Sequence, residues 1–246
     1  MNQSTLDFLV PGWRAPRHVR ALTTTRRGGV SSAPYASLNL ADHVGDERRS
    51  VETNRWLLQR SVECPTVPGW LRQRHGADVI DRDLNTGTDL GDGSLTRRTG
   101  TICAVLTADC VPLFLTDRNG RFAAVLHIGW RGLTAGIIES GLAAVATPCP
   151  QILAWIGPAI SGSAYKVGRE VRDKLLEAFP GHRSRFSPSG DRWLADLPGM
   201  VEQRLRNAGV IEVGSSGRCT FSEPEQWFSH RRDAPCGRMA SIIWLE

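Results

Sequence analysis

Several short segments of the chain are rich in Val, Ile, Leu and Thr and are bounded by Gly, Pro or Asp, a pattern that predicts β-strands. The predicted strands are 19–25, 77–83, 101–107, 111–117, 122–128, 151–156 and 239–245.

Other segments carry apolar residues at helical spacing. These predicted helices cover about 46–60, 134–146, 168–179 and 196–208. Asp46 is a candidate N-cap for the first helix. The last begins after Asp196, has Pro198 in its first turn and stops at Gly209. Because strands occur in adjacent pairs with helices interspersed, the order favours a mixed-sheet α/β (α+β) fold over a pure βαβ fold. Without an internal repeat or a low-complexity linker, we expect one domain, 1–246.

Composition and charge narrow the choice of partners. The chain has 41% hydrophobic and 22% charged residues, as is ordinary for a soluble globular protein. Its net charge is +5, but the arginines are spread along the chain, whereas a nucleic-acid protein usually concentrates them. We therefore expect no nucleic acid partner, and positioned arginines suit a small anion. No signal peptide or membrane-length apolar run occurs, and the six cysteines form no C-x-x-C pair, which favours free thiols in a reducing cytoplasm.

The stretch "ADCVPLFLTDRNGRFAAVLHIGW" predicts a hairpin, because Asn119-Gly120 separates two apolar runs. A two-residue turn pairs His127 with Pro112 and sets Cys110 opposite Gly129. A four-residue loop instead sets Cys110 opposite His127. In both registers Cys110 and His127 project from the same face at the same end, with Cβ atoms about 5 Å apart or roughly 7–8 Å apart on a diagonal. Such a pair can share a metal ion or act as nucleophile and base.

A catalytic zinc site needs three protein ligands and an open position for water. Among the six histidines, His75 is the best-placed third ligand, since it precedes a predicted strand and is followed by Gly76. The segment "GWRGLTAG" joins a strand end to a helix start, where free backbone N–H groups suit an anion. Arg131 lies there between glycines and is the preferred phosphate ligand; Arg26 and Arg231 are second choices. Trp130 packs under this turn or stacks on a base.

The chain resembles the YfiH family, also called the laccase-domain, polyphenol oxidase or peptidoglycan-editing-factor family. The motifs that carry the resemblance span nearly the whole chain and occur in the family's order: "TTRRGGVS" with "SLNL" and "HVGD" (24–46), "QRHGADV" (73–79), "TADCVP" (107–112), "HIGWRG" (127–132), "WIGPAI" (155–160), and "CT", "FSHRRD" and "GRMASIIWL" (219–245). One departure is His230, where the family more often carries tyrosine.

This resemblance implies a single CNF1/YfiH-like α/β/β/α sandwich with mixed sheets in a cytoplasmic protein, as a monomer or weak homodimer. It implies a zinc ion held by His75, Cys110 and His127. It also implies a purine nucleoside enzyme that phosphorolyses adenosine, inosine or 5′-methylthioadenosine and deaminates adenosine. On the same basis, Asn39, His43 and Tyr165 are expected to contact ribose or base.

The residues leave several chemistries open. Zinc with an open position activates water, and Asp109 is then a candidate general acid/base, although strict alternation points it away from Cys110. A multicopper oxidase needs many closely spaced histidines, so copper is less favoured than zinc as the metal. Cys110 and His127 could instead form a cysteine hydrolase or amidase acting on cell-wall precursors. A nucleotide-binding module without turnover is the remaining alternative.

Overall fold

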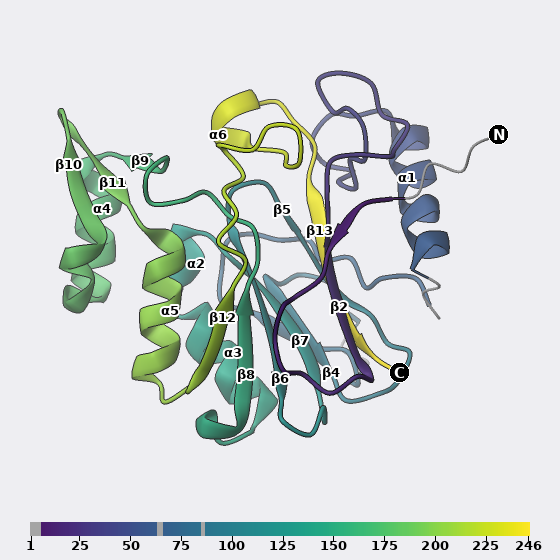
Figure 1. The fold of residues 1–246 in the computed structure, drawn as a ribbon, viewed down its shortest axis with the longest axis horizontal. Coiled ribbons are helices and arrows are strands. Elements are labelled where there is room, and N and C mark those ends of the chain that lie inside the picture. Colours follow the sequence, from purple (N-terminus) through teal and green to yellow (C-terminus); the bar gives the residue numbers. More distant parts are fainter. Residues whose placement is uncertain (1–5, 63–65, 85–86) are drawn as a thin grey trace.

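The computed structural model describes residues 6–62, 66–84 and 87–246, and two β-sheets form its centre (Figure 1). One sheet has four antiparallel strands in the order β1 (Phe8–Leu9), β2 (Val19–Thr24), β13 (Met239–Leu245) and β5 (Cys103–Thr107). The other has six strands in the order β12 (Glu212–Ser215), β8 (Ile152–Ile156), β6 (Val111–Asp117), β7 (Ala123–Ile128), β4 (Gly93–Thr96) and β3 (Val79–Asp81). The six-stranded sheet is mixed, because both its end strands run parallel to their neighbours.

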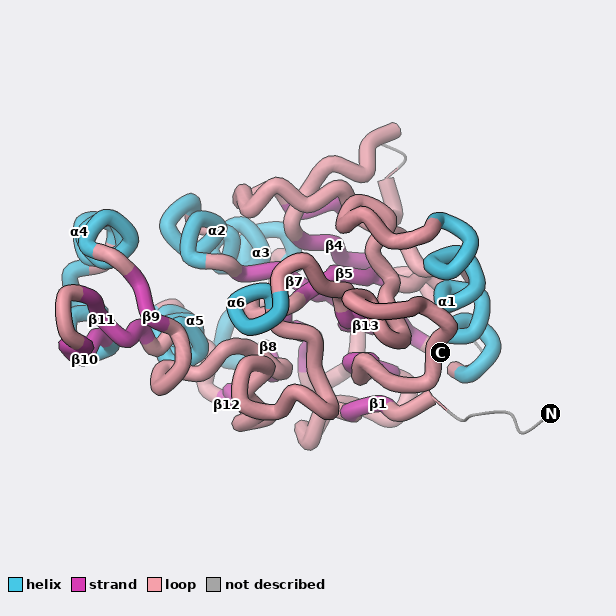
Figure 2. The backbone as a smooth tube through the Cα atoms, turned by 90° about the horizontal axis from the view of Figure 1, so that it is seen from above, coloured by secondary structure: helices cyan, strands magenta, loops and turns pink. Residues whose placement is uncertain are grey.

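The two sheets pack face to face, with helices outside both (Figures 1 and 2). Val105 and Ile243 of the four-stranded sheet bury against Phe114, Val125 and Trp155 of the six-stranded sheet. Helix α1 (Arg48–Ser61) covers the other face of the small sheet. Helices α2 (Trp130–Ala135), α3 (Ile137–Val145) and α5 (Leu197–Asn207) cover the other face of the large one. The predicted α/β/β/α arrangement is confirmed.

Smaller elements extend the large-sheet side. Helix α4 (Arg169–Ala178) lies beside a three-stranded sheet in the order β10 (Phe186–Ser189), β11 (Arg192–Ala195) and β9 (Lys166–Val167). The short helix α6 (His230–Asp233) precedes β13, and two 3₁₀ segments cover Cys149–Gln151 and Pro180–Arg185. No helix in the described ranges is long and apolar enough to cross a membrane.

All the predicted strands occur, some with shorter bounds, but two helix predictions are wrong in detail. The segment 134–146 is not one helix: α2 starts four residues earlier, and Gly136, at φ 88°, separates it from α3. Asp46 does not cap α1, whose N-cap residue is Glu47. Asp46 Oδ2 instead accepts hydrogen bonds from Ser31 Oγ and Asn39 Nδ2, and its Oδ1 accepts from the Glu47 N–H.

Candidate active site

The β6–β7 hairpin has the register of the two-residue turn. Pro112 pairs with His127 and Val111 with Ile128, which sets Cys110 opposite Gly129. A Cβ atom at Gly129 would lie 3.1 Å from Cys110 Sγ and 3.0 Å from the His75 ring. Because those contacts are tighter than almost all real Cβ contacts, glycine at 129 lets the backbone approach both side chains.

His75 joins the pair from the loop before β3. The possible ligating atoms of His75, Cys110 and His127 all lie within 4.8 Å of one another. The two imidazole rings meet edge to face, with centroids 4.7 Å apart. In a tetrahedral zinc site with ordinary bond lengths, the donor atoms are separated by roughly 3.3–3.6 Å. Small side-chain shifts therefore suffice for the three residues to hold one ion and leave a fourth position open.

The Asp92 carboxylate, which is nearly inaccessible to solvent, holds His75 and His127 in place by hydrogen bonds. Its Oδ1 accepts hydrogen bonds from His127 Nδ1 at 2.9 Å and from the His75 backbone N–H at 2.8 Å. Its Oδ2 accepts from the Arg74 and Gly76 backbone N–H groups at 3.1 and 2.7 Å. These bonds leave His127 Nε2 available as a ligand, and they support the left-handed conformation of His75 at φ 59°.

Sequence reasoning missed Asp92, because β4 is short and lacks an apolar run. Gly93 pairs with Leu126, so Asp92 lies beside His127 at the end of the ladder, where the His127 N–H also donates to the Asp92 carbonyl. Only a general rule points to such a residue: a ligating histidine usually donates its other ring N–H to a carboxylate or a carbonyl. The chain has 25 acidic residues, and the rule gives no spacing in the sequence, so it could not identify Asp92 as the partner.

The thiol and the imidazole stabilise each other's charged forms. Burial raises the pKa of the Cys110 thiol, but the His127 and His75 rings outweigh this effect and bring that pKa down to about 6. Burial lowers the pKa of His127, while the Cys110 thiolate and the Asp92 carboxylate outweigh it and raise the pKa to about 9. Near neutral pH, the metal-free pair is therefore a thiolate and an imidazolium.

In metal-stripped protein, alkylation of Cys110 by iodoacetamide is expected to reach half its maximal rate near pH 6. Because the folded pKa lies below the ordinary thiol value, the reactive thiolate is gained as the pH rises through about 6. Peptide mapping across a pH series measures the rate at each cysteine. Cys103, whose pKa burial raises to about 12, serves as the unreactive internal control. A Cys110 midpoint near pH 9 would contradict the thiolate–imidazolium pair.

The trio lies in the wall of a cavity of about 530 Å³, within the usual size range of small-molecule sites. Five further residues predicted from the sequence line the same cavity: His43, Asp109, Arg131, Tyr165 and Arg231. Its other lining residues include Gln73, Trp130, His230 and Arg238.

Both carboxylate oxygens of Asp109 accept hydrogen bonds from other protein groups. The residue is buried and adopts the left-handed conformation at φ 95°, so the strand alternation used to orient it does not apply. Its Oδ1 accepts a hydrogen bond from Thr220 Oγ1 at 2.6 Å, and its Oδ2 accepts from the Arg231 backbone N–H at 2.7 Å. The carboxylate therefore links the corner that bears Cys110 to helix α6.

Two arginines on the cavity wall lie against aromatic rings. The Arg131 guanidinium lies 4.4 Å from the centre of the Trp130 ring, and Lys174 approaches the same ring at 5.8 Å. The Arg231 guanidinium lies 5.1 Å from the Tyr165 ring and donates to the Lys166 carbonyl. Burial raises the pKa of Tyr165 to about 12, so its phenol stays protonated near neutral pH. Cationic and neutral polar groups thus share the cavity with His75, Cys110 and His127.

Two predicted substrate contacts, Arg26 and Asn39, are absent from the described residues that line the cavity. The Arg26 guanidinium donates to the Ala36 and Pro224 carbonyls. Asn39 is inaccessible to solvent, and its amide bonds Asp46 and the backbone of Ala41. Both side chains therefore organise loops. Of the cysteines, Cys64 lies outside the described residues, and the five others are free thiols, as predicted.

The fold and the His₂Cys trio define a single-domain α/β protein with a candidate one-ion metal centre on the wall of a polar cavity. The chain belongs to the family described as multi-copper polyphenol oxidoreductase laccase, whose model matches residues 20–246. Purine nucleoside phosphorylase YfiH of Shigella flexneri is 44% identical over 239 residues, covering 97% of this chain and 98% of that protein. Purine nucleoside phosphorylase PA4543 of Pseudomonas aeruginosa is 43% identical over 241 residues, covering 97% and 98% respectively.

Solved structures share the fold over nearly all of their length. The crystal structure of Neisseria meningitidis protein NMB0706 is 40% identical, with a TM-score of 0.93, and covers 97% of this chain and 99% of its own. YlmD from Geobacillus stearothermophilus is 31% identical, with a TM-score of 0.85, covering 94% and 93%. The predicted YfiH-type fold is therefore confirmed.

Proposed function

We propose that this protein is a zinc-dependent purine nucleoside phosphorylase that also deaminates adenosine. Its proposed nucleosides are adenosine, inosine and 5′-methylthioadenosine. One observation carries the proposal: a single cavity brings three metal-donor side chains together with the guanidinium groups of Arg131 and Arg231. The two relatives above, which match nearly the whole chain, are both named purine nucleoside phosphorylases, which supports the same activity.

In phosphorolysis, an oxygen of hydrogen phosphate attacks C1′ of the ribose, the glycosidic C–N bond breaks, and the leaving base takes up the proton that the phosphate gives up. The attacking anion needs cationic groups that hold it in place. Arg131 suits this role, since its guanidinium makes no hydrogen bond or ion pair to any described residue. Arg231 provides a second positive charge, and Tyr165 and His43, which line the same cavity, are the proposed contacts to ribose or base.

The donor set of two imidazoles and one thiolate suits zinc. When bound, zinc would act as a Lewis acid and lower the pKa of water, as deamination requires. His75, Cys110 and His127 would hold the ion, and Asp92 would orient His127. Multicopper oxidation is less favoured, because within the described ranges only this one group of three donors is close enough to hold an ion.

A second candidate function, that of a cysteine hydrolase, rests on the contacts among Cys110, His127 and Asp92. The Cys110 thiol lies beside His127, whose Nδ1 bonds Asp92, and this order matches the nucleophile, base and orienting carboxylate of a cysteine hydrolase. Metal content separates the two candidates. Protein that is purified without chelators and holds no metal, yet is labelled at Cys110 by an electrophilic substrate analogue, would favour the hydrolase.

Replacing Asp109 with asparagine separates a general acid/base from a positioning residue. Asparagine tolerates the left-handed conformation and keeps an oxygen that can accept the hydrogen bond from the Arg231 N–H. We expect kcat to fall less than about tenfold, whereas loss of a general acid/base costs about 10²–10⁴-fold. Steady-state kinetics with saturating inosine and phosphate measure the effect. A fall of 10² or more in correctly folded, metal-loaded protein would show that Asp109 takes part in proton transfer.

The experiment that tests the function compares adenosine with and without inorganic phosphate, with the products separated by chromatography. Adenine and ribose 1-phosphate, formed only with phosphate, would be phosphorolysis products. Inosine formed without phosphate would be the deamination product. Failure to form any of these from adenosine, inosine or 5′-methylthioadenosine would refute the proposal, and binding without turnover would favour a nucleotide-binding module.

A further inference from the structure

Helix α6 carries two cavity-lining residues but is too short to be stable without contacts to the rest of the molecule. It is only four residues long, from His230 to Asp233, and isolated helices of this length are unstable in water. His230 and Arg231 both line the cavity. The position of the Arg231 guanidinium must therefore come from contacts between α6 and the rest of the molecule.

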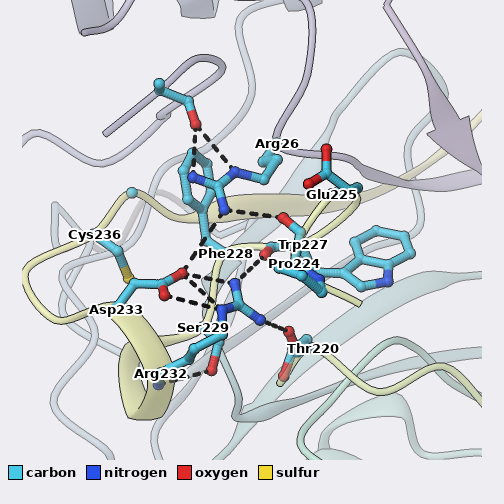
Figure 3. Close-up of polar contacts among 12 residues, drawn as sticks. Arg26, Thr220, Pro224, Glu225, Trp227, Phe228, Ser229, Arg232, Asp233 and Cys236 are labelled. Atoms are coloured by element: carbon cyan, nitrogen blue, oxygen red, sulfur yellow. Dashed lines mark hydrogen bonds and ion pairs between the residues drawn. The ribbon is translucent and has the colours of Figure 1, made fainter. Parts of the chain in front are cut away.

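Arg231 makes its own contacts, to the Lys166 carbonyl and the Tyr165 ring, and Arg232 makes several of the others (Figure 3). The Arg232 guanidinium donates to three main-chain carbonyls, those of Thr220, Phe221 and Trp227, at 2.6–2.8 Å. It also bonds both oxygens of the neighbouring Asp233. The side chain is only 17% exposed, so these bonds are largely shielded from water. The planar fork of arginine fits this set of acceptors in a way that lysine cannot.

Asp233 is shared with a second arginine from a distant part of the chain. Arg26 Nη1 lies 3.7 Å from Asp233 Oδ2, and the Arg26 guanidinium covers the Phe228 ring at 4.7 Å (Figure 3). Arg26 is itself fixed by the Ala36 and Pro224 carbonyls. We call Arg26, Arg232 and Asp233 the α6 anchor. Hydrogen bonds and the ion pair of this anchor hold α6 against the neighbouring loops. The Asp109 carboxylate accepts a hydrogen bond from the Arg231 backbone N–H.

We propose that Arg232 is a positioning residue that sets the affinity of the cavity for its anionic substrate by fixing the Arg231 guanidinium. This inference rests on the proposed function, in which Arg231 binds phosphate. Arg232 is absent from the described residues that line the cavity, and its guanidinium bonds main-chain carbonyls and the Asp233 carboxylate. Arg232 therefore acts through Arg231, and Arg26 supports it by holding Asp233.

The test uses the metal-loaded full chain and the substitution Arg232→Lys, which keeps the charge but loses the fork. Calorimetry with inorganic phosphate measures binding without turnover, and kinetics give KM for phosphate and for inosine. We expect the Kd and KM for phosphate to rise about tenfold or more, with KM for inosine and the zinc content within about twofold of the wild type. Arg218→Lys is the matched control, since Arg218 pairs with Glu223 on the exposed part of the same loop.

A double-mutant cycle adds a readout that general destabilisation would not mimic. Because Arg232 acts through Arg231, Arg231→Lys combined with Arg232→Lys should weaken phosphate binding no more than Arg231→Lys alone. Phosphate affinity of Arg232→Lys within twofold of the wild type, or fully additive effects in the cycle, would overturn the positioning role. If the wild type itself binds no phosphate and phosphorolyses no nucleoside, the proposed function falls together with this inference.

Discussion

Cys110→Ala is expected to lose the bound metal ion and to lower kcat/KM for phosphorolysis by at least about 10³-fold, or ~4 kcal/mol of transition-state stabilisation. The substitution removes the only thiolate donor of the trio and leaves two imidazoles. Elemental analysis of purified protein and steady-state kinetics with inosine and phosphate measure the two losses. The fold should persist, because Cys110 lies immediately before β6, outside the clusters of buried apolar residues.

Cys149→Ala is the matched control, since this free thiol is similarly half-buried but lies away from the cavity lining. Its metal content and activity should equal those of the wild type. A second variant, Cys110→Asp, keeps an anionic metal ligand but cannot act as a thiol nucleophile. Partial recovery of metal content and turnover in Cys110→Asp would support a ligand role. If Cys110→Ala keeps both its metal and its activity, the assignment of the site is wrong.

Asp92→Asn is expected to weaken metal binding by about 10–100-fold and to lower the free energy of unfolding by about 2–4 kcal/mol. The carboxylate accepts four hydrogen bonds, three from consecutive backbone N–H groups and one from His127. Asparagine keeps one acceptor oxygen and turns an NH₂ group toward the remaining donors. Burial raises the pKa of Asp92, but the hydrogen bonds from His127 and Gly76 outweigh it and lower that pKa, so the wild-type group is charged near neutral pH.

Metal titration with a competing chelator and denaturant unfolding measure the two effects of Asp92→Asn. Asp78→Asn is the control, because Asp78 is an exposed carboxylate in the same loop whose replacement should cost less than about 0.5 kcal/mol. Unchanged metal affinity and stability in Asp92→Asn would show that Asp92 does not orient the ligands.

The central strands could be predicted because β6 and β7 are buried on both faces and leave continuous apolar runs in the sequence. The Asn-Gly turn then fixed which residues share a face, which brought Cys110 and His127 together without any structural information. The turn did not distinguish between the two possible loop lengths. The observed register settles this, with Gly129 opposite the cysteine.

Contacts between distant segments could not be predicted in this way. Asp92 meets His127 through a strand pairing without a hydrophobic signature, and Arg26 meets Asp233 across more than 200 positions of chain. Arg26 was a second choice for the phosphate ligand, but its guanidinium bonds the Ala36 carbonyl and pairs with Asp233, and it is absent from the described residues that line the cavity. The local sequence pattern shows which residues could bind a metal or an anion, whereas only the fold shows which of them line the same cavity.

The most direct test of the central claim is a zinc titration of metal-stripped protein, with phosphorolysis of inosine followed at each addition. The account predicts that activity is absent without metal, rises linearly with zinc and stops rising at one equivalent per chain. It also predicts that Cys110→Ala shows no such rise. Full phosphorolysis by metal-stripped protein, or a rise in Cys110→Ala equal to that of the wild type, would contradict the claim that one ion at His75, Cys110 and His127 supports the reaction.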